Sequence, residues 1–337
     1  MKYGLIGEHL KHSYSKIIQE RLLDNYHYDL KELTKSELGT FMKHKDFLGI
    51  NVTIPYKQAV LPYLDEVDDS AKKIGAINTI VHKNHRLFGY NSDYYGFAYM
   101  LDHHHIDICD KKIIILGNGG ASRAVQAVIK DRKPRTMLVV SRHTNDATIF
   151  IDEVYKQHLD ADIIINTTPV GMYPKIHASC IDLTNFDKLS ACIDVIYNPY
   201  ATTFLLAAKA KNILAIGGLE MLVAQAKKTL EIFKDISIDE REIDIVYKEL
   251  TLTTINIILV DVNHKEAKQV AVNLHKTFID NINISSATHL RNALICVSSK
   301  KLQHAKLTTT LVRNSWFLNE KTSNEIIAEF QSLLKYL

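Results

Sequence analysis

The sequence has few cysteines, no long apolar run and no marked excess of either charge. Its four cysteines, Cys109, Cys180, Cys192 and Cys296, form neither a Cys-x-x-Cys pair nor a zinc-type cluster, so we expect reduced, buried thiols. The net charge of +3 over 337 residues includes no basic block of the kind that binds nucleic acid or anionic lipid. We therefore expect neither nucleic acid nor a membrane as a partner.

Segments that carry a chain into or across a membrane are also missing. No stretch approaches the roughly 18 apolar residues of a membrane span, and residues 1–7 lack the long apolar stretch of a signal peptide. The sequence therefore predicts a cytoplasmic protein, either a monomer or a homodimer.

Three consecutive histidines, His103, His104 and His105, raise the question of a metal ion. Consecutive helix positions point in different directions, so we expect these imidazoles not to converge on one ion. The sequence thus predicts no metal site.

The pattern of apolar residues predicts two α/β domains and a smaller third unit. Short apolar runs alternate with amphipathic stretches over residues 1–102. Residues 103–217 place a buried strand, a glycine turn and a helix in immediate succession, as in a Rossmann-like fold. The pattern then restarts, so we interpret residues 250–337 as an appended α/β module.

Gly117, Gly119 and Gly120 form the turn between the strand at 112–116 and the helix at 122–130. Such a turn lets the backbone approach a pyrophosphate, which the helix N-terminus then stabilises. Glycine turns also serve as plain connectors, but the position directly after an apolar strand favours a dinucleotide site.

The next strand, at 137–140, is followed by Arg142 and not by a carboxylate. Arginine at this place accommodates the ribose phosphate of NADP, whereas Asp or Glu binds the free ribose of NAD. The sequence therefore favours NADP, and the alternative for Arg142 is a solvated surface residue.

Polar side chains gather at the ends of three predicted strands in the first domain. Asn51 and Thr53 share one face of the strand at 49–53, and Lys57 follows that strand. Asn78 and Asp93 lie at the ends of two others. An aspartate beside a lysine stabilises the ammonium and orients it for the proton exchange that must accompany hydride transfer at a secondary alcohol. We take Lys57 and Asp93 as the candidate catalytic pair; the alternative for a lysine after a strand is a surface residue.

Ser13 and Ser15 lie between the first strand and the first helix. Hydroxyls at a helix N-terminus either cap the helix or bind a carboxylate. Capping explains one serine, and the presence of two favours an anion site.

Seven motifs, in the same order along the chain, resemble those of the shikimate dehydrogenase family, from residue 3 to about residue 233. They are His12-Ser13-Tyr14-Ser15, Asn51-Val52-Thr53-Ile54-Pro55-Tyr56-Lys57, Gly75-Ala76-Ile77-Asn78-Thr79, Gly89-Tyr90-Asn91-Ser92-Asp93, Gly117-Asn118-Gly119-Gly120-Ala121, Asn166-Thr167-Thr168-Pro169-Val170-Gly171-Met172 and Gly218-Leu219-Glu220-Met221-Leu222-Val223-Ala224-Gln225. The resemblance implies a reversible, NADPH-dependent reduction of 3-dehydroshikimate to shikimate, within aromatic amino-acid (chorismate) biosynthesis. The reaction would take place in a cleft between the two domains.

The resemblance also implies a role for individual residues. Lys57 and Asp93 would form the acid/base pair, and Ser13 and Ser15 would bind the substrate carboxylate. The ring hydroxyls would contact Thr53, Asn78 and Gln225, with Asn51 and Tyr197 nearby. The cofactor would contact Gly117, Asn118, Gly119, Gly120, Ala121, Arg142 at the ribose phosphate, Thr167, Gly218 and Met221 at the nicotinamide. The helix at about 218–235 would return to the first domain and complete it.

Some positions depart from the family pattern. Ser141-Arg142-His143 replaces the common Asn-Arg-Thr, and Asp146 falls where a second basic residue often stands, so the use of NAD stays open. Two alternative functions stay open, namely an NAD-preferring quinate/shikimate dehydrogenase and a non-catalytic binding protein on the same fold.

The C-terminal module resembles the opening of shikimate kinase at residues 255–260 and 278–280, yet it lacks the phosphate loop of that family. Residues 261–268 contain no glycine that would let the backbone cradle phosphates. We interpret the module as a shortened, inactive kinase remnant or as an unrelated α/β extension. A chain ending near residue 245 is expected to keep dehydrogenase activity.

Overall fold

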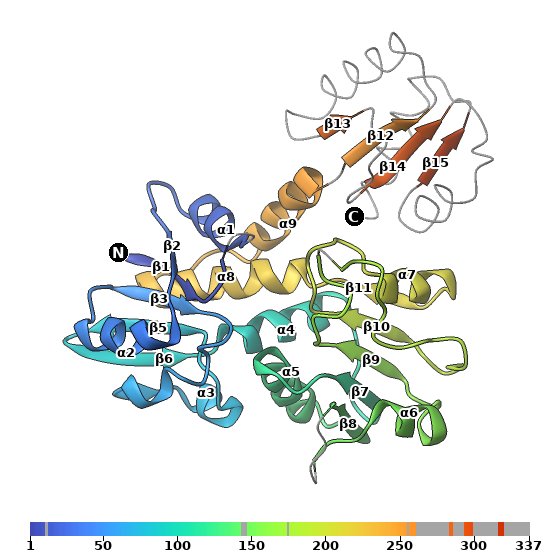
Figure 1. The fold of residues 1–337 in the computed structure, drawn as a ribbon, viewed down its shortest axis with the longest axis horizontal. Coiled ribbons are helices and arrows are strands. Elements are labelled where there is room, and N and C mark those ends of the chain that lie inside the picture. The colour runs from blue at the N-terminus through green and yellow to red at the C-terminus, as the bar shows by residue number, and fades with distance from the viewer. Residues whose placement is uncertain are drawn as a thin grey trace.

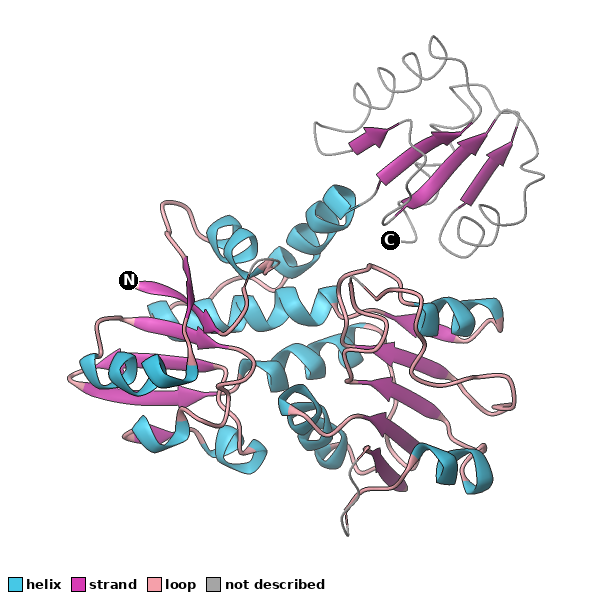
Figure 2. Cartoon of the chain, viewed as in Figure 1, coloured by secondary structure: helices cyan, strands magenta, loops and turns pink. Residues whose placement is uncertain are grey.

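The computed structural model describes residues 1–10, 13–142, 147–173 and 175–254 and, beyond these, strands at 256–260, 283–285, 293–298 and 316–319. Within this part the protein has the predicted α/β architecture, organised around separate sheets (Figure 1, Figure 2). Some residues named from the sequence lie outside the described residues, namely His12, His143, Asp146 and the segment 261–268.

The first sheet is mixed and has the strand order β2-β1-β3-β5-β6-β4. Its strands are β1 (Tyr3–Gly7), β2 (Asp29–Glu32), β3 (Gly49–Val52), β4 (Glu66–Val67), β5 (Thr79–Lys83) and β6 (Arg86–Tyr90). Strand β5 runs antiparallel to both β3 and β6, and the other pairs are parallel. The helical elements of this region are α1 (Ser15–Leu22), α2 (Lys35–His44), the 3-10 turn η1 (Leu61–Tyr63) and α3 (Asp69–Ile74).

The second sheet is entirely parallel and has the order β11-β10-β9-β7-β8. Its strands are β7 (Lys112–Leu116), β8 (Thr136–Val140), β9 (Ile163–Asn166), β10 (Ala191–Asp194) and β11 (Leu214–Ile216), with helices α5 (Gly120–Asp131), α6 (Ile151–Gln157) and α7 (Thr203–Ala210). The three isoleucines at 113–115 are fully buried, as expected for a central strand with helices on both faces. The strand order reverses at β7, so its carboxyl end is the switch point where open α/β sheets bind ligands.

Two helices, α4 (Ser92–His103) and α8 (Leu219–Lys234), lie side by side between the two sheets (Figure 1). Gly96 of α4 allows this close packing, because a β-carbon there would lie only 2.6 Å from the carbonyl oxygen of Met221. Phe97 and Met100 of α4 and Met221 of α8 belong to the same buried core as the apolar strand β7. The two helices therefore connect the sheets through a shared core.

Helix α9 (Arg241–Thr254) packs against α1 and α8, and it runs through residue 250, where the sequence analysis began the third unit. Ile243 and Val246 are almost completely buried in this contact. The four strands that follow form a parallel sheet in the order β13-β12-β14-β15. They are β12 (Asn256–Val260), β13 (Asn283–Ser285), β14 (Ala293–Ser298) and β15 (Trp316–Asn319).

The expectation of uniformly buried thiols is wrong for Cys109, which is exposed. It lies in the turn before β7, where its backbone N–H donates to the Asp107 carboxylate. Cys192 is buried in β10, Cys180 is partly buried, and all three thiols are free. Within the described part of the chain, no helix has the length and apolar character needed to cross a membrane.

Candidate active site

Lys57 and Asp93 form a close ion pair between the turn after β3 and the start of α4. The Lys57 Nζ atom lies 2.5 Å from Asp93 Oδ2, and the two side chains are only 15% and 11% exposed. The sequence placed Asp93 at a strand end, whereas the structure places it in the first turn of α4, capped by Asn91. The free backbone N–H groups of a helix N-terminus stabilise a carboxylate at this position.

Asn78 fixes the orientation of the Asp93 carboxylate. Its Nδ2 atom donates to Asp93 Oδ1 over 2.9 Å, which leaves Oδ2 facing the Lys57 ammonium. The Asn78 side-chain oxygen accepts from the Ser92 backbone N–H. Because Asn78 is 3% exposed and engaged at both ends, it acts in this structure as a support for Asp93.

Asn51 is also fully engaged within the protein. Its Oδ1 accepts from the Tyr28 hydroxyl over 2.6 Å, and its Nδ2 donates to Asn78 O, Thr79 and Thr229. The sequence analysis missed Thr229, which also bonds to Ser92 and so ties α8 to this network. A signal was present, because Gln225 and Thr229 are four residues apart and share one helix face.

Gln225 borders the same network, and both Gln225 and Thr53 are partly exposed. The Gln225 Oε1 atom accepts from the Ser92 hydroxyl over 3.1 Å, and its Nε2 donates to the Leu222 carbonyl. Thr53 packs against the backbone of Gly7, where a β-carbon would lie 2.6 Å from its methyl group. Their partial exposure leaves both side chains accessible to a ligand.

Ser13, Ser15 and Tyr197 lie together at the start of α1. The Ser13 hydroxyl accepts from the Ser15 backbone N–H over 3.2 Å, so part of its function is a local turn. Tyr14, between the two serines, packs against Tyr197, with ring centroids 5.4 Å apart. Burial raises the pKa of the Tyr197 phenol, which keeps it neutral. Among the described hydrogen bonds, none links these serines directly to Lys57 or Asp93.

The glycine turn at 117–120 has the geometry that the sequence predicts for a dinucleotide site. Gly117 has a φ of +102°, and a β-carbon there would lie 2.8 Å from the Thr167 hydroxyl, so a side chain does not fit. Gly119 faces open space, with no atom within 4 Å of its missing β-carbon. It caps α5, whose first turn has neither a side-chain cap nor an acidic residue. These N–H groups are available to an anion such as a pyrophosphate.

The glycine turn and the catalytic candidates lie against each other. A β-carbon on Gly120 would lie 3.4 Å from Cδ and 3.9 Å from Cβ of Lys57. The structure therefore joins the predicted cofactor turn, after β7, to the predicted reaction pair, after β3 and at α4. The candidate sites of the two sheets are therefore adjacent.

The remaining predicted cofactor residues differ in their surroundings. Arg142 is exposed beyond the end of β8, and Ala121 lies in the first turn of α5. The side-chain oxygen of Asn118 accepts from the Gln126 side chain. The Thr167 hydroxyl donates to the backbone carbonyl of Leu116 over 2.7 Å.

Packing within the protein is sufficient to explain why glycine is at 218 and methionine is at 221. A β-carbon on Gly218 would lie 2.2 Å from the Val195 carbonyl oxygen, so this position requires glycine. Met221 is 6% exposed and belongs to the core between α4 and α8. Their contact with a cofactor stays a prediction.

The prediction that the consecutive histidines diverge is wrong for two of the three. His103 is the last residue of α4 and His104 is its C-cap, so the chain leaves helical geometry there. Both imidazoles contact the buried carboxylate of Glu220, with His104 Nε2 at 2.8 Å from Oε2. The side-chain divergence of a regular helix does not apply at its end.

Comparison with known proteins gives consistent matches. The model of the shikimate dehydrogenase substrate binding domain matches residues 5–80. A shikimate dehydrogenase (NADP(+)) from Clostridium beijerinckii is 42% identical over 253 residues, which cover 71% of this chain and 94% of the relative.

Solved structures of shikimate dehydrogenases are also similar to this chain. A chorismate mutase/shikimate 5-dehydrogenase fusion protein from Clostridium acetobutylicum has a TM-score of 0.69 at 39% identity, covering 74% of this chain and 96% of that one. A Thermus thermophilus shikimate 5-dehydrogenase in complex with NADP(H) and shikimate has a TM-score of 0.66 at 27% identity, covering 74% and 98%.

Proposed function

This chain belongs to the shikimate dehydrogenase family, and from this premise we propose how its residues catalyse the NADP-dependent interconversion of shikimate and 3-dehydroshikimate. The chain is an oxidoreductase that acts on a ring CH–OH group with NADP. The observation that supports the assignment of residues is the Lys57–Asp93 pair, 2.5 Å apart and directly beside Gly120 of the glycine turn.

Lys57 is the proposed proton carrier. Both Asp93 oxygens are engaged as acceptors, Oδ1 from Asn78 and Oδ2 from Lys57, so the carboxylate acts as a fixed negative charge. The ammonium has three N–H donors, of which the Asp93 bond uses one. In the oxidation direction the substrate hydroxyl gives its proton to the lysine amine, and in the reduction direction the ammonium returns a proton to the new alkoxide oxygen.

The substrate ring is proposed to lie over Lys57 and Asp93, held at its edge by Thr53 and Gln225. Asn51 and Asn78 support this pocket from behind, because their own polar atoms are already bonded to protein groups. Ser13 and Ser15 would bind the carboxylate at the N-terminus of α1, with Tyr197 packed beside them.

The glycine turn fits a dinucleotide, since Gly119 leaves open space and α5 presents uncapped N–H groups. A nicotinamide cofactor held there would supply the hydride-transfer chemistry of the reaction. Arg142 would pair with the ribose phosphate, and Thr167 would border the turn. The tight Gly117–Thr167 contact keeps the turn close to the sheet, so backbone and not a side chain would face a pyrophosphate there.

Aromatic amino-acid biosynthesis and a cytoplasmic location are part of the same proposal. The reaction yields shikimate, and free Cys109, Cys180 and Cys192 suit a reducing compartment, where disulfides are rare.

Initial rates with purified protein test the function. Turnover should be fastest with shikimate and NADP⁺, and slower when quinate replaces shikimate or NAD⁺ replaces NADP⁺. A preference for quinate with NAD⁺ would contradict the cofactor and substrate assignment, and no turnover with any pair would contradict catalysis.

The C-terminal module is proposed to contribute no kinase chemistry, because residues 261–268 offer no glycine for a phosphate loop. Incubation of the full chain with ATP, Mg²⁺ and shikimate should yield no phosphorylated product; formation of shikimate phosphate would disprove this.

A further inference from the structure

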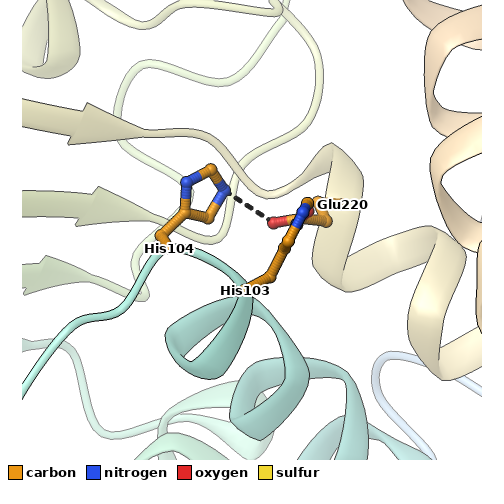
Figure 3. A group of neighbouring side chains, drawn as sticks. All are labelled: His103, His104 and Glu220. Carbon is orange, nitrogen blue, oxygen red and sulfur yellow. Dashed lines mark hydrogen bonds and ion pairs between the residues drawn. The ribbon is translucent and has the colours of Figure 1, made fainter.

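A second cluster of chemically capable side chains lies at the opposite end of α4 from Asp93. His103 ends α4, His104 follows it, and Glu220 lies in the first turn of α8 (Figure 3). Figure 3 shows both imidazoles directed at the Glu220 carboxylate. None of the three belongs to the hydrogen-bond network around Lys57 and Asp93.

Burial makes this cluster unusual. The Glu220 side chain is 4% exposed, whereas those of His103 and His104 are 44% and 35% exposed. A carboxylate removed from water requires compensation by a cation, by hydrogen bonds or by a metal. Here each of the two carboxylate oxygens contacts one imidazole nitrogen, and the two histidines form the solvent-exposed side of the cluster.

The donor set and its spacing suit a borderline metal. Two histidine nitrogens and one carboxylate oxygen are ligands typical of zinc, which keeps a fourth position for water when the protein supplies three. The three ligand atoms lie within 4.8 Å of one another. Bonds of about 2.0–2.2 Å in a tetrahedron place ligand atoms roughly 3.4 Å apart, so small side-chain adjustments suffice.

The surroundings of His103 support the same interpretation. While its Nδ1 faces Glu220, its Nε2 lies 3.9 Å from Asp244 Oδ1 of α9. A carboxylate that accepts a hydrogen bond from the far nitrogen orients metal-binding imidazoles in many sites, and Asp244 reaches that role once the 3.9 Å separation shortens to hydrogen-bond distance. Tyr99, one turn earlier on α4, packs on the same ring with centroids 5.6 Å apart.

We propose that His103, His104 and Glu220 bind one Zn²⁺ ion that joins the end of α4 to the start of α8. The ion ties together the two helices that connect the sheets. Because α4 carries Asp93 and α8 carries Gln225, the site would stabilise the frame of the active site without touching the substrate.

Metal titration of the full, untagged chain tests this proposal. After treatment with a chelator and dialysis, Zn²⁺ binding is measured by calorimetry, and Co²⁺ binding by the visible absorption of four-coordinate cobalt. We expect the unsubstituted protein to bind one more ion per chain than either Glu220→Gln or His104→Gln binds. Loss of a ligand should weaken binding by more than the ~10–100-fold that follows loss of an outer partner.

His105→Gln is the matched control, because His105 is the next residue, is exposed and lies outside the cluster. It should keep the ion and the rise in melting temperature that Zn²⁺ causes. Equal stoichiometry and equal thermal shifts in all four proteins would overturn the proposal and show a hydrogen-bonded cluster only. Since His104 is partly exposed, His104→Gln serves as the test if Glu220→Gln does not fold.

Discussion

Gly120 and Lys57 are direct neighbours, with the missing β-carbon of the glycine 3.4 Å from Cδ of the lysine. They are far apart in the sequence and follow strands of different sheets, yet they bring the proposed dinucleotide turn against the proposed acid/base pair. A hydride and a proton leave neighbouring atoms of one alcohol, so the groups that accept them must lie side by side. This contact is the geometric basis for assigning the reaction to this site.

Lys57→Ala should fold normally and lose kcat by a factor of about 10²–10⁴, because it removes a positioned acid/base group. Steady-state kinetics with shikimate and NADP⁺ measure this loss. Lys72→Ala is the control, since Lys72 is an exposed lysine of α3 that pairs with Asp69. Wild-type turnover in Lys57→Ala would refute the assignment.

Arg142→Ala should raise the KM for NADP⁺ about 10- to 100-fold, the typical effect of losing one hydrogen bond to a charged group. The KM for NAD⁺ should barely change, because NAD⁺ lacks the phosphate. Arg135→Ala, which removes an exposed arginine at the other end of β8, should affect neither. An equal effect of Arg142→Ala on both cofactors would show that it does not read the phosphate.

Asp194 should give the stability of the protein a distinct pH dependence. Burial raises the pKa of its carboxyl from 3.8 to about 6, although hydrogen bonds from Thr202, Ile196 and Asn166 act in the opposite direction. The folded state therefore holds this proton more tightly than the unfolded state does. The resulting contribution to the free energy of unfolding is complete below about pH 3.8 and is lost as the pH rises through 6. This contribution is roughly 3 kcal/mol.

Asp194→Asn should remove this dependence, because an amide does not titrate. The free energy of unfolding of the variant, relative to the unsubstituted protein, should increase between pH 4 and pH 7, as measured by denaturant titration at each pH. A pH-independent difference between the two proteins would contradict the shifted carboxyl.

Truncation should show that helix α9 belongs to the dehydrogenase. The sequence alone predicts that a chain ending near residue 245 keeps its activity, but that end lies inside α9. Ile243, Val246 and Leu250 are buried against α1 and α8, and burial of one such side chain contributes about 1.5–3 kcal/mol. A chain ending at 254 should keep its activity and melting temperature. A chain ending at 245, inside the helix, should melt at a markedly lower temperature; equal melting of both would show that α9 is dispensable.

Several local features of the protein are determined by the sequence alone. Residue periodicity and the backbone freedom of glycine determine the apolar strand at 112–116, the glycine turn and the amphipathic helix that follows. The sequence alone therefore predicts this unit. The seven motifs together identified the family. The same periodicity predicts the end of the strand that leads to Lys57.

Only the tertiary structure decided which of these segments meet. Pairing of β3 with β5, and packing of α4 against α8, bring Lys57, Asp93 and Thr229 together from three distant segments. The contact of His103 and His104 with Glu220 likewise depends on where α4 ends and how closely Gly96 lets α8 approach. Sequence periodicity reports which face of an element is buried, whereas the partner on the other side is chosen by packing over the whole chain.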